Sequence, residues 1–347
     1  MDKEVLYEML ETPSPSGSEL ILQKKLIAAM KDVDDKVITS HNKNVIHVVN
    51  PDSPVKILLC AHVDEVGLYV DKLYDNGLVG VAALGNVTPY IYVGAQVKVI
   101  KKDGSEINGV IGTVPNIDKG GLKFSSLRMD IGASNRAQAE KLVSVGEPIV
   151  FANAYSCLAN GRLSGRALDD KIAVFAVCRA MSRAKKKGCK NGLYFAATVG
   201  EELNGRGAKL AAQIVKPTIA VALDVCHTSD VEFLDEHSGE IALGKGPALQ
   251  TGSLVNSELY EMLLSSAKKL GIKVQTVYES DYTHTDLDNM FSVDPSVPLC
   301  GVRIPLRYMH SSVEVCDMGD IEQIVDLLTE FLTSIDENTS FDPFGRE

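Results

Sequence analysis

The sequence predicts an α/β fold, in which helices cover both faces of a mixed, mainly parallel sheet and a small β-rich domain is inserted. Three observations predict this fold. Short apolar runs such as Leu193–Val199, bounded by Gly192 and Gly200, are typical of strands buried on both faces. Such runs alternate with segments of helical periodicity in both outer parts of the chain. Between them, from about Val70 to Ala154, short β-like runs separated by turn residues replace the alternation.

The first part of the chain predicts two helices followed by three strands. Apolar residues recur at helical spacing in Lys3–Glu11 and Glu19–Met30, and the Pro- and Gly-containing stretch Pro13–Gly17 separates the two helices. The predicted strands are Lys36–Thr39, Val45–Val49 and Ile57–Ala61.

The middle of the chain, residues 70–154, predicts an inserted β-rich domain. Its β-like runs are Tyr92–Ile100, Ile107–Val114 and Glu147–Phe151, and one helix is expected at Asn135–Leu142. We therefore expect residues 1–69 and 155–347 to form one α/β domain, into which residues 70–154 are inserted.

The α/β pattern resumes after the insertion. A helix is expected after Asp170, and the last helix, Gly319–Ile335, has a buried stripe at helical spacing. The remaining predicted elements are the helices Gly207–Val215 and Ser257–Leu270 and the strands Leu193–Val199, Ile219–Leu223, Val274–Tyr278 and Val297–Ile304.

Composition excludes several classes of partner. The chain has 347 residues, of which 45% are hydrophobic, and a formal charge of −11, which argues against nucleic-acid and anionic-membrane surfaces. No stretch approaches the roughly 20 apolar residues of a membrane span, and the first residues do not open a signal peptide. The seven cysteines are scattered and often lie inside apolar runs, which indicates reduced thiols in a cytoplasmic protein.

Residues that bind metals or transfer protons follow several of the predicted strands. Ligands in open α/β sheets bind beyond the carboxyl ends of the strands, so these residues are expected to meet at one edge. Two further candidates lie at the start of the helix after Leu168 and shortly after the strand Val297–Ile304. The candidates are His62, Asp64, Asp169, Asp170, Glu201, Glu202, Asp224 and His310.

The pairs His62 with Asp64 and Asp169 with Asp170 each have two interpretations, and the residues alone do not decide between them. His62 and Asp64 are two apart, so in an extended segment both side chains leave the same face. Asp64 could then orient a metal-bound His62, or the pair could be a buried hydrogen-bonded contact. Asp169 and Asp170 are typical of a helix cap, although a carboxylate in this position could also bridge two cations.

The later carboxylates favour a functional interpretation more strongly. Glu201 and Glu202 point in different directions if the backbone is extended, so one could bind a metal while the other acts as a general base. A solvated helix start is the alternative. Asp224 follows an apolar run, which is unfavourable for a charge without a partner and favours a ligand role. Cys226 is a rival ligand, although we interpret it as a core thiol.

The histidines complete the expected metal centre. His227, His237 and His284 lie in polar stretches and rank below His62 and His310 as ligands. Two histidines and three carboxylates fit two zinc-like ions that share one carboxylate, about 3.5–4 Å apart, with metal–ligand distances of about 2.0–2.2 Å. One metal centre explains all five segments together, namely those with His62 and Asp64, Asp169 and Asp170, Glu201 and Glu202, Asp224, and His310.

At these residues the sequence resembles the tetrahedral and glutamyl aminopeptidase family, cytosolic di-metal exopeptidases that include deblocking aminopeptidases. The similarity spans nearly the whole chain, and the order and spacing of its short motifs are specific. The matching segments are 61–67 (AHVDEVG), 129–134 (MDIGAS), 167–171 (ALDDK), 201–208 (EELNGRGA), 223–225 (LDV), 244–247 (GKGP) and 304–311 (IPLRYMHS).

The resemblance implies two divalent ions per subunit, for which we expect zinc or cobalt. His62 and Asp224 would hold one ion. Glu202 and His310 would hold the other, and Asp169 would bridge the two.

The resemblance also implies the catalytic roles and the assembly. Glu201 would be the general acid/base, Asp64 would orient His62, and the Asp169–Asp170 peptide bond would be cis. The inserted domain would form dimers, and the dimers would assemble into a hollow dodecamer that admits short peptides with a free N-terminus. The chain departs from the family at Gly200, where relatives usually have Gln, at Asn204, and in the segment Thr283–Asp288, so its substrate preference is open.

The predicted function is a metal-dependent aminopeptidase that removes N-terminal residues from short peptides with a metal-activated water. The first alternative is a related di-metal deacylase that acts on a small N-acyl compound. A glycoside hydrolase is disfavoured, because adjacent Glu201 and Glu202 cannot easily supply carboxylates roughly 5–9.5 Å apart across one bond. A non-catalytic assembly or peptide-binding protein is the third alternative.

Overall fold

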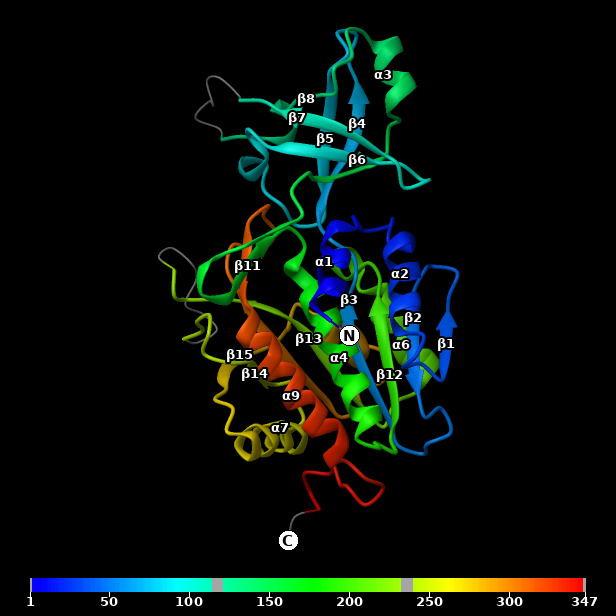
Figure 1. Cartoon of the computed structure of the whole chain (residues 1–347), viewed down its shortest axis with the longest axis vertical. Helices are drawn as coiled ribbons and strands as arrows, with labels where there is room; N and C mark the ends of the chain where they lie inside the picture. The colour runs from blue at the N-terminus through cyan, green and yellow to red at the C-terminus, as the bar shows by residue number, and fades with distance from the viewer. Residues whose placement is uncertain (1, 114–120, 232–239, 346–347) are drawn as a thin grey trace.

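The computed structural model describes residues 2–113, 121–231 and 240–345, and the chain forms a large α/β part and a small barrel (Figure 1). The barrel stands at one end of the molecule, above the helices α1 (Lys3–Glu11) and α2 (Leu20–Met30). Among the described residues, no helix is long and apolar enough to cross a membrane.

The large sheet holds the first strands of the chain and most of the later ones. Its strands, in spatial order, are β1 (Lys36–Thr39), β2 (Val45–Val49), β12 (Gly192–Thr198), β3 (Lys56–His62), β13 (Ile219–His227), β16 (Leu299–Leu306), β14 (Ala248–Gly252) and β15 (Gln275–Glu279). The central strands β12, β3, β13 and β16 are mutually parallel, so their carboxyl ends meet at one edge. The outer pairs β1–β2, β2–β12 and β14–β16 are antiparallel, which makes the sheet mixed.

Helices cover both faces of this sheet, as predicted. The remaining helices are α3 (Arg136–Leu142), α4 (Leu168–Lys186), α5 (Glu201–Asn204), α6 (Arg206–Val215), α7 (Ser257–Leu270), α8 (Asp286–Phe291) and α9 (Met318–Ser334). One core packs α1, α2, α4, α7 and α9 against the sheet, and α4 and α9 lie side by side. A second core packs small residues of α6, such as Ala208 and Ala211, and Leu287 of α8 against the opposite face.

The small part is a closed antiparallel barrel with its own core. Its strands, in order around the barrel, are β4 (Gly67–Leu73), β5 (Val79–Leu84), β8 (Met129–Asp130), β7 (Glu106–Ile111), β6 (Gln96–Ile100) and β9 (Pro148–Phe151). A third sheet, β10 (Tyr155–Cys157), β11 (Arg162–Gly165) and β17 (Glu314–Asp317), leads from the barrel back to α4.

The run Tyr92–Ile100 is not one strand, contrary to the sequence prediction. A 3₁₀ turn at Pro89–Tyr92 precedes β6, which begins only at Gln96. The strand cannot extend back through Gly94, because the φ of Gly94 is +80°, a value that an extended strand does not allow. In the predicted strand Ile107–Val114, β7 ends at Ile111, and Val114 lies outside the described residues.

Candidate metal centre

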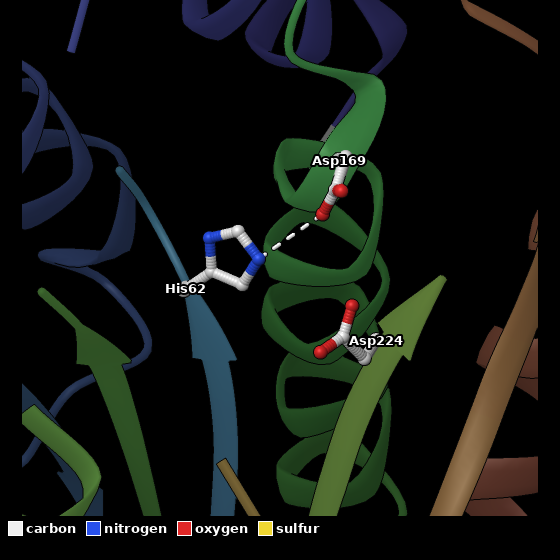
Figure 2. Close-up of side chains that lie close together, drawn as sticks. All are labelled: His62, Asp169 and Asp224. Carbon is white, nitrogen blue, oxygen red and sulfur yellow. Dashed lines mark hydrogen bonds and ion pairs between the residues drawn. The ribbon is translucent and has the colours of Figure 1, made fainter. Parts of the chain in front are cut away.

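The predicted ligands meet at the carboxyl edge of the central strands. His62 ends β3, and Asp224 lies near the end of the neighbouring β13. Since Ala222 pairs with Cys60 in the parallel register, His62 and Asp224 fall at the same level of the sheet. Asp169 comes from the start of α4 and faces both residues (Figure 2). The Asp169–Asp170 peptide bond is cis, as the resemblance implies.

The five predicted ligands form two groups that share Asp169. In the inner group, one ligand atom each of His62, Asp169 and Asp224 lies within 4.8 Å of the others, and all three residues are buried. In the outer group, Asp169, Glu202 and His310 meet the same distance criterion, and Glu202 and His310 are half-buried.

Asp169 faces one histidine with each carboxylate oxygen. Its Oδ1 lies 3.0 Å from His62 Nε2, and its Oδ2 lies 3.2 Å from His310 Nε2. Glu202 Oε2 also lies 3.3 Å from His310 Nε2. A single carboxylate therefore reaches both groups, as a bridging ligand must.

Backbone carbonyls orient both imidazoles. His62 Nδ1 is 3.0 Å from the carbonyl oxygen of Asp64, and His310 Nδ1 is 2.8 Å from that of Asn86. A carbonyl only accepts hydrogen bonds, so each Nδ1 carries the proton and each Nε2 is directed at the carboxylates. With Nδ1 donating to a carbonyl, loss of the Nε2 proton leaves the tautomer in which Nε2 can bind a metal ion.

Carboxylates outnumber imidazoles among the five ligand candidates of this centre. Burial raises the pKa of Glu202 to about 7 and that of Asp224 to about 6. Burial opposes protonation of His310, yet hydrogen bonds to Asp169 and Glu202 raise its pKa to about 12. Burial also opposes protonation of His62, but the hydrogen bond to Asp169 together with the charges of Glu201, Asp169 and Asp170 raises its pKa. The carboxylates thus exceed the positive charge that the chain places among them.

The residues present fit divalent metal ions. Two imidazoles and three carboxylates are the donor set that zinc-like ions prefer in catalytic sites. Among the described residues, Glu202 Oε1 is buried without a hydrogen-bond partner, although a buried charged oxygen is costly to leave unpaired. A cation within the outer group would satisfy it.

The two predicted catalytic residues lie beside the inner group. Glu201 Oε2 is 3.9 Å from His62 Nε2, and burial raises the pKa of Glu201. The Asp64 carboxylate accepts the backbone N–H of Glu201 at 3.1 Å and the Ser16 hydroxyl at 2.6 Å. It lies 3.8 Å from His62 Nδ1, which instead contacts the Asp64 carbonyl. The Asp64 side chain therefore holds Glu201 more directly than it holds His62.

A cavity of about 430 Å³ opens onto both groups. Cys226, His227 and His284 line it, but among the described residues they belong to neither group, and His237 lies outside the described residues. Burial raises the pKa of Cys226 to about 12, so this rival ligand stays a protonated thiol at neutral pH.

Two departures from the family pattern adjoin this cavity, since Gly200 precedes Glu201 and the segment Thr283–Asp288 supplies part of the lining. Gly200 has a φ of +69°, and a Cβ there would lie 2.1 Å from Nη1 of Arg206, so the Arg206 guanidinium fills the space beside it. In the segment Thr283–Asp288, Thr283 and His284 line the cavity. Asp286 is buried and accepts a hydrogen bond from Thr198, and burial raises the pKa of Asp286 to about 7.

Sequence reasoning missed the residues that support the centre. Ser16 holds Asp64, and the carbonyl of Asn86 orients His310 from the segment after β5. Both lie in polar turns, and small polar residues in turns are common without any function. No spacing signal connects them to His62 or His310.

Comparison with known proteins identifies the family. The family model described as M42 glutamyl aminopeptidase matches residues 43–327. The chain is 30% identical over 346 residues to a lysyl aminopeptidase of Pyrococcus furiosus, covering 96% of this chain and 98% of that protein.

Solved structures agree with this assignment. A TET aminopeptidase from a marine sediment archaeon of the Thaumarchaeota superimposes with a TM-score of 0.90 at 29% identity, covering 96% of each chain. The TET1 peptidase of Pyrococcus horikoshii gives a TM-score of 0.85 at 28% identity, covering 96% of this chain and 99% of that one. With two candidate metal-binding groups at the carboxyl edge of its sheet, this chain belongs to the M42 glutamyl aminopeptidase family and is a metal-dependent aminopeptidase.

Proposed function

We propose that this aminopeptidase removes N-terminal residues from short peptides with two divalent ions, zinc or cobalt, one held by the inner group and one by the outer group. The observation that carries the proposal is the position of Asp169, whose two oxygens lie 3.0 Å from His62 Nε2 and 3.2 Å from His310 Nε2. When bound, divalent ions polarise a peptide carbonyl and make water a stronger nucleophile at neutral pH.

Glu201 is the proposed general acid/base. It lines the cavity beside the inner group, and its side chain is 14% exposed, so a substrate can reach it. The carboxylate takes a proton from the attacking water and returns it to the leaving amine. Asp64 fixes the Glu201 backbone through the hydrogen bond of 3.1 Å, which keeps the Glu201 carboxylate over the cavity.

The cavity sets the size of the substrate. Pockets that bind small ligands usually have volumes of about 300–1,000 Å³, and this one of about 430 Å³ suits one terminal residue and its peptide bond. Glu279, Thr283 and His284 line the cavity without belonging to either metal group among the described residues, and the first side chain of the peptide would lie against them.

The proposal extends to a homo-oligomer built from dimers, with a dodecamer as the expected form and the domain at residues 70–154 as the dimer contact. The Pyrococcus horikoshii TET1 peptidase is described as assembling into a tetrahedron or a large octahedral shell. On the barrel of this chain, Tyr90, Val110 and Val145 are exposed apolar side chains that a second subunit would cover. The mass of the purified protein, measured by light scattering, checks this part.

The test of the catalytic proposal is the variant Glu201→Gln. We expect it to bind the same number of metal ions as the wild type while its turnover falls by roughly 10²–10⁴-fold. Metal content is measured by mass spectrometry, and turnover on a panel of aminoacyl substrates with and without chelator. Undiminished turnover would contradict the role of Glu201, and activity on N-acetyl amino acids alone would favour the deacylase.

A further inference from the structure

Glu314 is a buried carboxylate at the start of β17 that contacts two members of the outer group through their backbone. Its side chain is 1% exposed. Oε1 accepts the N–H of His310 at 2.8 Å, and Oε2 accepts the N–H of Asp169 at 3.2 Å. Among the described residues, Glu314 belongs to neither metal group. One carboxylate thus joins the shared ligand to a ligand that only the outer group has.

The loop that carries His310 needs such support. His310 and Tyr308 have φ values of +61° and +59°, in the left-handed region that non-glycine residues occupy at a cost. The loop is closed at its base by paired backbone hydrogen bonds of 3.0 Å between Arg307 and Val315. Beyond this base, Glu314 accepts the N–H of His310, while the carbonyl of Asn86 and the carboxylates of Asp169 and Glu202 contact its ring.

The inner group is held differently. His62 and Asp224 belong to β3 and β13, two neighbouring central strands with a parallel hydrogen-bond ladder. Glu314 takes no part in this ladder. We therefore expect the loss of Glu314 to change mainly the distance between Asp169 and His310.

We infer that Glu314 is a positioning residue that sets the spacing of Asp169 and His310 and thereby the affinity of the outer group for its metal ion. This inference rests on the two-ion function proposed above. Both Glu314 oxygens face N–H donors, and a glutamine can accept with only one oxygen while its amide N–H faces a donor. The variant Glu314→Gln keeps the volume of the side chain and removes one of the two contacts.

The test is an equilibrium zinc titration of the purified full-length protein. We expect Glu314→Gln to bind the outer ion about 10–100-fold more weakly than the wild type, the usual effect of losing a residue that orients a metal ligand. The affinity for the inner ion should change much less, because His62 and Asp224 stay on their paired strands. The variant His310→Ala lacks the outer imidazole, so the binding step that remains in its titration is the step of the inner group. Added zinc should restore the turnover of Glu314→Gln.

The matched control is Asp320→Asn. Asp320 is also a fully buried carboxylate that accepts two backbone N–H groups, those of Gly244 and Gly246, each at 2.8 Å. It belongs to neither metal group among the residues that the structure describes. We expect it to bind both ions like the wild type, even if its thermal stability falls.

The outcomes separate the inference from the proposed function. If the wild type binds no second ion, both fail. If the wild type binds two ions and Glu314→Gln binds both equally well, the positioning role alone is wrong. Equal weakening of both ions, or the same loss in Asp320→Asn, also overturns it. If Glu314→Gln does not fold, Glu314→Asp, which is one methylene shorter, should show the selective loss, and a wild-type titration curve for it refutes the role.

Discussion

Two buried clusters of charged side chains lie next to each other in this protein. They differ in whether the chain supplies enough positive charge for their carboxylates. Glu65 lies between Arg166, whose Nη1 contacts Oε2, and Lys171, whose Nζ lies 3.0 Å from Oε1. Only three residues earlier, His62 opens a centre in which carboxylates exceed the positive charge. We call Glu65, Arg166 and Lys171 the balanced cluster, because the chain itself supplies the positive charge that its carboxylate needs. We call the two groups that share Asp169 the metal centre.

The pKa values express the difference. Burial opposes ionisation of Glu65, but the charges of Arg166 and Lys171 lower its pKa to about 2. In the metal centre, burial raises the pKa of Asp224 to about 6 and that of Glu202 to about 7. The chain supplies its own countercharge where it needs only stability. In the metal centre, a divalent ion would supply that charge.

The largest effect is expected from breaking the balanced cluster. Glu65→Gln leaves Arg166 and Lys171 buried without their anion, and we expect a loss of about 3–5 kcal/mol in the free energy of unfolding. Urea denaturation followed by circular dichroism measures it. The exposed Glu140, which pairs with Arg136 on the surface of α3, provides the control, because Glu140→Gln should leave stability unchanged. Equal curves for Glu65→Gln and the wild type would remove the contrast between the clusters.

Metal removal should destabilise the protein through the other cluster. Ions that bind only the folded state add about 2.7 kcal/mol at 100 times their dissociation constant and about 4.1 kcal/mol at 1,000 times. We therefore expect a chelator to lower the thermal midpoint of the wild type and of Glu65→Gln by similar amounts. In Asp169→Asn, which lacks the shared carboxylate, the chelator shift should largely disappear. A full shift in this variant would mean that the stabilising ions bind elsewhere.

Acid should erase the advantage of the balanced cluster. The folded-state pKa of Glu65, about 2, lies below the ordinary value of 4.5, so ionised Glu65 stabilises the fold above pH 4.5. This contribution, roughly 3 kcal/mol, is lost as the pH falls from 4.5 towards 2. The difference in stability between the wild type and Glu65→Gln should narrow over this range. A constant difference would show that the charge of Glu65 is not its cause.

The smallest effect is expected from neutralising Asp224 in metal-free protein. Because burial raises its pKa, Asp224→Asn removes an unfavourable charge, while it also loses the attraction of Arg303, 3.7 Å away. We expect the metal-free variant to be as stable as the wild type, or more stable by roughly 1 kcal/mol. Thermal denaturation in chelator checks this. A loss of stability as large as that of Glu65→Gln would show that the charge of Asp224 is already compensated within the chain.

The sequence predicts the metal centre but not the balanced cluster. His62, Glu202 and Asp224 follow apolar strands, and parallel strands bring such ends to one edge, so the fold and the meeting of the ligands could be predicted. The contacts that support them could not. Ser16 reaches Asp64, and Asn86 reaches His310 from another part of the fold, through contacts with no fixed spacing. Gly94, which interrupts a predicted strand, shows that turns inside apolar runs escape the same reasoning.

The central claim is that the excess carboxylates of the metal centre hold two cations around Asp169. Anomalous diffraction at the zinc edge, from crystals of the wild type grown with zinc, tests it most directly. We expect two peaks on either side of the Asp169 carboxylate, one beside His62 and Asp224 and one beside Glu202 and His310. A single peak, or peaks away from Asp169, would contradict it.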